Sequence, residues 1–316
     1  MPQGANVWTL DWLTLHPDGE HRDAVGVQWI LTQEKGFWGT PGTNATFSSR
    51  LARHGAYRSP GWKKQRTISL TGRAYAEDYT VLRQAEAQLL GLLSDPRAPR
   101  ALTCYSELGA LTCDVFLDDE ILCSPVSVVS EPGIEFSIQV VAPDPAKYSV
   151  ERQTMTTGLP QDSAEDGLDF NQVVQPDKNQ GLFFGMGADD DGLLFGTSNA
   201  TGFMRLTNRG SAPTTPVFTL YGPLTKPTLT AGSATMRYNG TLTAGEYVVI
   251  DPNAPSVLLG GAAVRRHLLN PAQFDGFAIP PASRTGGPGV LSVGLTHSGA
   301  LTDSGYVTAV FRSAWF

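Results

Sequence analysis

Alternating apolar and polar residues predict β-structure along most of this chain. In residues 134–141, Ile-Glu-Phe-Ser-Ile-Gln-Val-Val, apolar positions recur at every second residue, which is the period of a strand with one buried face. Further β-prone runs cover residues 7–15, 25–31, 66–72, 111–117, 216–221, 247–250 and 306–312. Because glycine and proline separate these runs at short intervals, the pattern predicts a mainly β protein with sandwich-like or barrel-like domains.

One stretch has helical periodicity instead. Between residues 78 and 93, Asp78 is a suitable N-cap and Ser94-Asp95-Pro96 would stop the helix. The apolar residues that fall on one face are Leu82, Ala85, Leu89 and Leu92. The sequence therefore predicts a single amphipathic helix, packed on the sheet of the first domain.

A proline-containing junction divides the chain. Pro143 and Pro145 fix φ and lack backbone donors, so neither a helix nor a sheet ladder can pass through this segment. A length of 316 residues also exceeds what one core usually supports. We predict a first β-domain over residues 1–147, with its helix near 78–93, and a second over 148–316. A polar, loop-rich stretch is expected near residues 158–200.

Composition indicates a folded protein without a membrane span. Hydrophobic residues make up 41% and charged residues 17% of the chain, and no apolar run approaches the roughly 20 residues of a membrane helix. The first six residues contain neither a basic segment nor an apolar run, so no signal peptide is predicted. We expect synthesis in a cytosol.

Charge is distributed unevenly in the first half. Residues 35–76 contain eight basic residues and no acidic one, whereas the next predicted hairpin is acidic. Opposite patches can register neighbouring copies of a subunit. The residues predicted to pair in this way are Arg50, Arg53, Lys63, Lys64 and Arg66 with Asp118, Asp119 and Glu120. A solvated loop is an alternative. Nucleic-acid binding through Tyr57 and Trp62 is another, but the net charge of −7 argues against it.

No recognised catalytic or metal-binding motif occurs. The three cysteines lack the paired spacing of zinc sites, and the five histidines are scattered along the chain. The acidic run at residues 189–191 lacks the alternating ligands of a calcium-binding loop. We therefore predict no catalytic residue, cofactor or metal. A glycosidase remains an open alternative, because its two carboxylates can come from distant strands.

The second half carries a family resemblance. Its motifs are Asn208-Arg209-Gly210 and residues 216–223, 242–251 and 257–261, which follow one another in the order seen in distal tail proteins of long-tailed bacteriophages. The junction at 144–148, Arg265-Arg266 with Leu268-Leu269, and the closing Arg312-Ser313-Ala314-Trp315 look most like versions from phages of actinobacteria. The resemblance spans nearly the whole chain, and the order of the motifs carries its specificity.

This resemblance implies a structural virion protein rather than an enzyme. Relatives form a hexameric ring at the distal end of the tail, around the DNA channel, with a galectin-like second domain projecting outward. The implied partners are other copies of the chain, the tail tube protein and the tail-associated hub, with tape measure and receptor-binding proteins as further candidates. The protein would be made in the cytoplasm of the host bacterium, without sequence-specific nucleic-acid binding or membrane insertion.

A galectin-like sandwich could also bind host cell-wall carbohydrate. Exposed aromatic side chains would form such a site, and the candidates are Tyr238, Tyr306 and Trp315. The alternative is that these aromatic residues pack in the core or at an interface, where aromatic residues are common.

Overall fold

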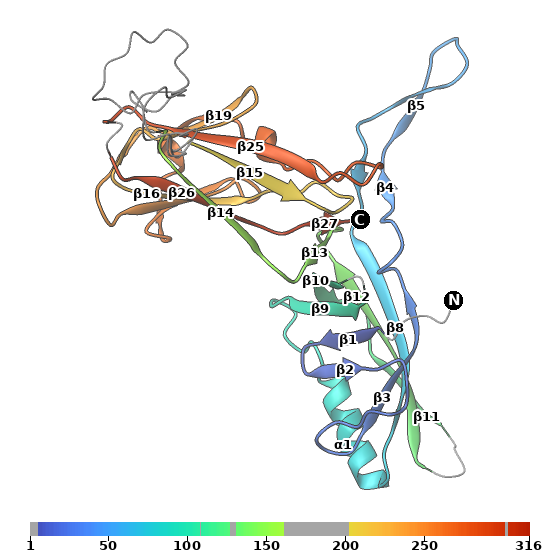
Figure 1. Cartoon of the computed structure of the whole chain (residues 1–316). Coiled ribbons are helices and arrows are strands. Elements are labelled where there is room, and N and C mark those ends of the chain that lie inside the picture. Colours follow the sequence, from blue (N-terminus) through green and yellow to red (C-terminus); the bar gives the residue numbers. More distant parts are fainter. Residues whose placement is uncertain (1–5, 108, 127–130, 161–201, 301–302) are drawn as a thin grey trace, which may run out of the picture. The chain divides into compact units, whose positions relative to one another are not determined.

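The computed structural model describes residues 6–107, 109–126, 131–160, 202–300 and 303–316 (Figure 1). The chain divides into two compact units, of which the first comprises Met1–Glu151 together with Arg312–Phe316, and the second Arg152–Phe311. The division after residue 151 lies close to the predicted boundary after residue 147. The prediction differs at the C-terminus, because residues 312–316 return to the first unit as its last strand.

A ten-stranded antiparallel sheet forms the first unit. Its main path is β2-β1-β9-β10-β12-β8-β3; β11 pairs with β12, β13 with β10, and β27 with β13. The bounds are β1 Val7–Leu10, β2 Leu13–Leu15, β3 Gln28–Lys35, β8 Arg66–Tyr75, β9 Arg100–Ser106, β10 Gly109–Leu117, β11 Leu122–Val126, β12 Gly133–Ala142, β13 Lys147–Ser149 and β27 Ala314–Trp315.

Strand β12 shows why the alternating pattern was informative. Ile134, Phe136, Ile138 and Val140 are buried, while the residues between them are half-buried. The strand pairs with β8 along its whole length, from Gly133 opposite Tyr75 to Ala142 opposite Arg66. The predicted strand is confirmed, and its buried face lies in the core of the first unit.

The predicted helix is also present, as α1 Tyr79–Leu90. The Asp78 side chain accepts a hydrogen bond of 2.8 Å from the backbone N–H of Thr80, as expected of an N-cap. Leu82, Ala85 and Leu89 are buried in the same core as β12. The helix ends before Gly91 rather than near residue 93, because the Gly91 amide closes the last turn onto the carbonyls of Ala87 and Gln88.

The second unit is a sandwich of two antiparallel sheets. One sheet has the order β14-β26-β16-β21-β22-β23 and the other β15-β25-β18-β19-β24. Their bounds are β14 Gln153–Gly158, β15 Phe203–Asn208, β16 Val217–Tyr221, β18 Thr228–Ala231, β19 Ala234–Tyr238, β21 Tyr247–Asp251, β22 Ser256–Leu259, β23 Ala263–Val264, β24 Leu269–Ala272, β25 Gly289–Thr296 and β26 Tyr306–Phe311. A small pair, β17 Leu224–Thr225 and β20 Thr241–Leu242, and two 3₁₀ turns, η1 Arg266–Leu268 and η2 Phe274–Phe277, complete it.

Both sheets of the sandwich contribute to one core. Phe218 and Val248 enter it from the first sheet, and Leu206 and Val293 from the second. Phe218 meets Phe277 edge to face, with ring centroids 5.6 Å apart. The mainly β, two-domain prediction is therefore confirmed. Among the described residues, no helix has the length and apolar character needed to span a membrane.

Candidate assembly surface

A long hairpin in the first unit presents most of its side chains to solvent. It spans residues 42–64, called here the arm, and consists of four short strands: β4 Thr43–Asn44 pairs with β7 Trp62–Lys63, and β5 Phe47–Ser49 pairs with β6 Ala56–Arg58. Figure 1 shows β4 and β5 beyond the end of β8. None of the arm's residues is buried. The arm is therefore held by backbone hydrogen bonds without a core of its own.

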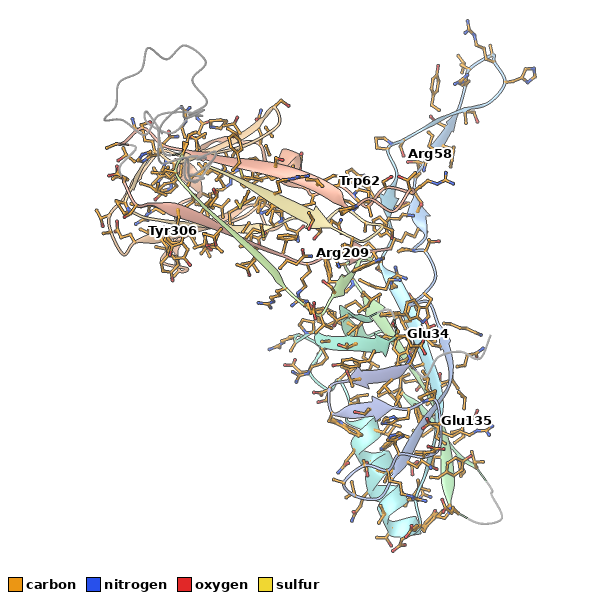
Figure 2. All side chains as sticks on the ribbon, in the orientation of Figure 1. Glu34, Arg58, Trp62, Glu135, Arg209 and Tyr306 are labelled. Carbon is orange, nitrogen blue, oxygen red and sulfur yellow. The ribbon has the colours of Figure 1, made fainter. Side chains whose placement is uncertain are left out.

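Four large apolar side chains of the arm are exposed. The exposed fractions are 97% for Leu51, 75% for Trp62, 68% for Phe47 and 63% for Tyr57. Figure 2 marks Trp62 and Arg58 on this segment. Large aromatic side chains contribute most to binding when a partner covers them. A contiguous hairpin of this kind has the composition of a protein contact surface.

The arm also carries positive charge without any acidic residue. Its basic residues are Arg50, Arg53, Arg58, Lys63 and Lys64. The Arg50 guanidinium lies 5.0 Å from the centre of the Tyr57 ring, and the Lys63 ammonium lies 5.5 Å from the ring of Phe316. All five residues are exposed. Four of the five basic residues of the predicted pairing patch, namely Arg50, Arg53, Lys63 and Lys64, thus lie on one hairpin.

Arg66, the fifth, does not belong to this surface. Its exposed fraction is 2%, and its guanidinium donates to the carbonyls of Gly36, Phe37, Gly39 and Pro145 at 2.6–3.0 Å. Burial lowers the pKa of this guanidinium. Arg66 connects the base of the arm to the Pro145 segment inside the subunit, so it is not available to a neighbouring copy.

A second buried cation lies at the base of the arm. Lys147, 3% exposed, donates to the Phe37 carbonyl at 2.8 Å, and its ammonium lies 5.2 Å and 5.5 Å from the rings of Phe37 and Trp38. Burial, and secondarily the charge of Arg66, lowers the pKa of Lys147 to about 8. Arg66 and Lys147 together fix residues 36–39, from which the arm starts.

The acidic residues lie on the turn between β10 and β11. Asp118, Asp119 and Glu120 are all exposed. Asp118 accepts a hydrogen bond of 2.9 Å from the Gln139 side-chain amide, and the Asp119 carboxylate accepts from the Glu120 amide at 2.9 Å. This acidic turn is therefore an exposed patch of the opposite sign to the arm.

The three candidate ligand-facing aromatic residues have different environments. Tyr238 is 3% exposed and belongs to the core of the sandwich, so it cannot face a ligand. Trp315 is half-buried in β27, which belongs to the first unit rather than to the sandwich. Strand β27 pairs with β13, and Trp315 lies opposite Lys147. Alternation alone does not reveal which unit a terminal strand joins.

Tyr306 is exposed at 38% and forms part of a tyrosine row. It stacks on Tyr221, with ring centroids 4.7 Å apart and an interplanar angle of 17°, and Tyr221 lies 5.8 Å from Tyr247. The three residues lie opposite one another on β26, β16 and β21. Figure 2 marks Tyr306 on the second unit. Of these three tyrosines only Tyr306 was predicted, because cross-strand neighbours depend on register.

Two other expectations have different outcomes. The acidic run at 189–191 and nearly all of the predicted loop-rich stretch lie outside the described residues. The histidines are less scattered than the sequence suggested, because His16 and His21 stack with ring centroids 4.2 Å apart. Cys104 and Cys113 are buried, and burial raises the pKa of each thiol to about 12, which disfavours the nucleophilic thiolate form.

Comparison with known proteins gives fold-level similarity only. No family model and no curated protein matches the sequence. Among solved structures, the Dit protein of phage SPP1, described as a paradigm of the hub adsorption apparatus in phages that infect Gram-positive bacteria, matches with a TM-score of 0.61. The identity is 11%, and the match covers 98% of this chain and 99% of that one.

Two further structures match more weakly. They are the baseplate of phage P2 in its activated conformation with Ca and with Sr, with TM-scores of 0.44 and 0.43. The identities are 12% and 10%, with coverage of 98–99% of each chain. Over 98% of its length, this chain is therefore similar in fold to the Dit protein of phage SPP1.

Proposed function

We propose that this protein is a structural component of a phage tail tip, a distal tail protein that assembles into a hexameric ring between the tail tube and the baseplate hub. The observation that carries the proposal is the similarity in fold to the SPP1 protein over 98% of this chain. The order of the sequence motifs supports the same role independently. The role requires surfaces for assembly and no catalytic group.

The arm supports assembly from copies of the same chain. Leu51, Trp62 and Phe47 are exposed in the single subunit, although burying each would contribute roughly 1.5–3 kcal/mol. Binding of a partner that covers the arm gains this free energy of burial. An acidic surface on the partner also pairs with the basic residues of the arm. The turn at Asp118–Glu120 has that charge and occurs once in every copy. In a ring, each subunit would receive the arm of one neighbour.

Oligomeric state tests the proposal. Mass photometry of the full chain, alone and mixed with tail tube and hub proteins of the same phage, should detect a hexamer in at least one setting. Replacing Phe47 and Trp62 by serine should shift that population to monomers. The matched control is Leu90→Ser, which removes an exposed side chain at the end of α1, outside the arm. A wild-type protein that stays monomeric in every mixture would overturn the ring.

The tyrosine row favours a second candidate function, binding of host cell-wall carbohydrate. Stacked aromatic faces next to threonine hydroxyls, such as those of Thr219 and Thr308, resemble the surfaces that hold sugar rings. Titration with host cell-wall polysaccharide should then show saturable binding that Tyr306→Ala weakens. Tyr79→Ala, which removes an exposed tyrosine from the first unit, is the control. Absence of binding to every host fraction would reject this candidate.

A further inference from the structure

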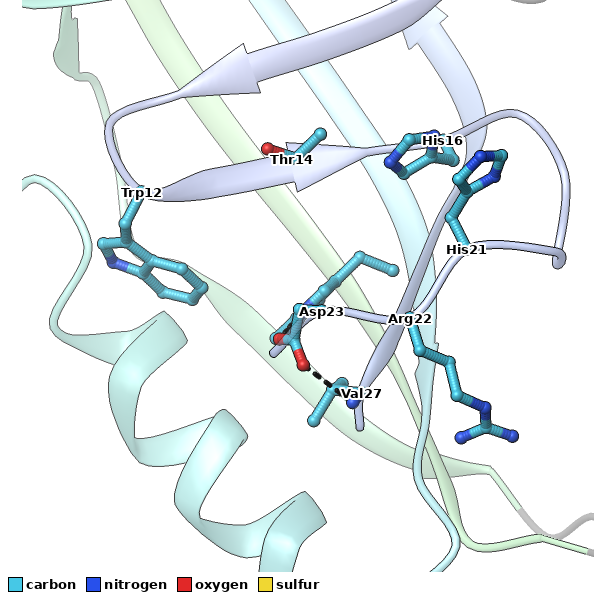
Figure 3. Close-up of a pocket in the computed structure, with 8 residues that line it drawn as sticks. Trp12, Thr14, His16, His21, Arg22, Asp23 and Val27 are labelled. Carbon is cyan, nitrogen blue, oxygen red and sulfur yellow. Dashed lines mark hydrogen bonds between the residues drawn. The ribbon is translucent and has the colours of Figure 1, made fainter. Parts of the chain in front are cut away.

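His16, Asp18 and His21 bring three potential metal ligands together on the first unit. One nitrogen or oxygen atom from each side chain lies within 4.8 Å of the others. The Asp18 carboxylate lies 3.2 Å from Nδ1 of His21, and the two imidazole rings are parallel within 4°. Figure 3 shows the two rings face to face at one end of a surface hollow. No other such group of three occurs among the residues that the structure describes.

The backbone around this cluster is fixed at both ends. The His16 amide donates to the Trp29 carbonyl at 3.0 Å, and the His16 carbonyl accepts from the Leu31 amide at 2.8 Å, so His16 is tied to β3. At the other end, the Asp23 carboxylate accepts from the Val27 amide and from Nε1 of Trp29 at 2.8 Å and 3.0 Å. The segment between these anchors comprises only residues 17–22, which limits the conformational entropy lost on binding.

Two imidazoles and a carboxylate favour a divalent ion that is intermediate between hard and soft. Imidazole suits Zn²⁺, Cu²⁺, Ni²⁺ and Fe²⁺, whereas Ca²⁺ and Mg²⁺ prefer sites made of oxygen atoms. We propose that His16, Asp18 and His21 bind a divalent transition metal ion, with Zn²⁺ as a suitable representative. Three protein ligands leave at least one coordination position open, and water would fill it from the solvent side.

The hollow beside the histidines provides room for such an exogenous ligand. It has a volume of about 250 Å³ and is lined by the cluster's two histidines together with Trp12, Thr14, Arg22, Asp23, Val27 and Trp29. Arg22 is paired with Glu131 at 3.1 Å, which offsets the repulsion between its charge and a cation. Ligation needs a modest rearrangement. Bonds of about 2.1 Å require the ligand atoms to approach one another to roughly 3.4 Å, and each ring must turn its lone pair toward the ion.

Binding of the metal alone tests this proposal. Calorimetric titration of the full chain with ZnCl₂ at neutral pH should show one site, and Co²⁺ should give a visible absorption band that Zn²⁺ displaces. His16→Ala and His21→Ala should each weaken zinc affinity at least about tenfold. Replacing a residue that only orients a ligand already costs about that much affinity, and these two residues would be ligands themselves. His54→Ala, in the tip of the arm, is the matched control and should leave affinity unchanged.

Two further variants make the outcome decisive. Asp18→Asn keeps the shape of the side chain and should also weaken zinc binding. Cys123 is the least buried of the three cysteines, so its thiol is the alternative ligand to test. Cys123→Ser should leave the zinc affinity unchanged. Unchanged thermal melting of each variant without metal shows that the fold is retained. Wild-type affinity weaker than about 1 mM, or equal losses in His16→Ala and His54→Ala, would overturn the proposal.

Discussion

The arm and the second unit place their large apolar side chains in opposite environments. In the second unit, Phe218 and Phe277 lie fully buried between two sheets. In the arm, Phe47 and Trp62 lie in short antiparallel strands and are 68% and 75% exposed. The sandwich is stabilised by its own contacts, whereas the apolar side chains of the arm can be buried only by another molecule. This difference separates residues needed for folding from those we assign to assembly.

The largest effect should come from truncating matched phenylalanines. Phe218→Ala should cost about 3–5 kcal/mol and lower the unfolding transition of the second unit, because it leaves a cavity in a closed core. Phe47→Ala should change the stability of the subunit by less than about 0.5 kcal/mol, as expected of a surface site. Calorimetry at a concentration where the protein is monomeric measures both. A large loss of stability in Phe47→Ala would show that the arm folds against its own subunit.

A smaller loss should follow from removing the Arg66 guanidinium. Arg66→Met keeps the aliphatic stem but leaves the carbonyls of Gly36, Gly39 and Pro145 without this donor, at a cost of about 3 kcal/mol. Arg58→Met, on the arm, should cost almost nothing in the monomer. Urea unfolding of the two variants measures the contrast. Equal stabilities would contradict the role given to Arg66 at the base of the arm.

Strand β12, helix α1 and the segment around Arg66 show where structure can be predicted from the sequence and where it cannot. Strand β12 and helix α1 were predictable because burial on one face leaves a period of 2 or 3.6 in the sequence. Arg66 and Lys63 have the same charge and lie three residues apart, but only register and tertiary contacts decide that one is buried and the other exposed. The arm was missed as a hairpin because its strands have two or three residues and bury no face.

Pairing between strands far apart in the sequence explains the other features that the sequence did not predict. Trp315 lies at the C-terminus, yet its strand joins the first unit through β13, a contact across more than 160 residues that no local pattern encodes. The tyrosine row requires the register of three strands at once. The spacing His-x-Asp-x-x-His of residues 16–21 was a usable signal. Positions along the chain do not show that the two rings stack, so no metal site was predicted from the sequence.

The buried Lys147 predicts a pH dependence. Its pKa is about 8 in the folded protein and 10.5 in the unfolded chain, so the folded state loses this proton first as pH rises. The unfolded state then binds more protons, and the contribution of Lys147 to stability should increase between pH 8 and pH 10.5. Below pH 8 the residue is charged in both states, and its contribution stays constant.

Comparison with Lys147→Met separates the pH-dependent contribution of Lys147 to stability from the contributions of other titrating groups. The free energy of unfolding of the wild type minus that of the variant should rise from pH 7 to pH 10, by at most about 3 kcal/mol. Lys64→Met, which changes an exposed lysine of the arm, should show no such trend. A difference that stays flat over this range would mean that Lys147 titrates as it does in water.

The most direct test of the account is a charge exchange between the arm and the acidic turn. Lys63→Glu with Lys64→Glu should reduce the fraction of rings seen by mass photometry under conditions in which the wild type forms them, because two attractive contacts become repulsive. Adding Asp119→Lys and Glu120→Lys should restore rings, while Asp118 is kept for its bond to Gln139. Intact rings in the first variant, or no recovery in the fourfold variant, would contradict the pairing of arm and turn.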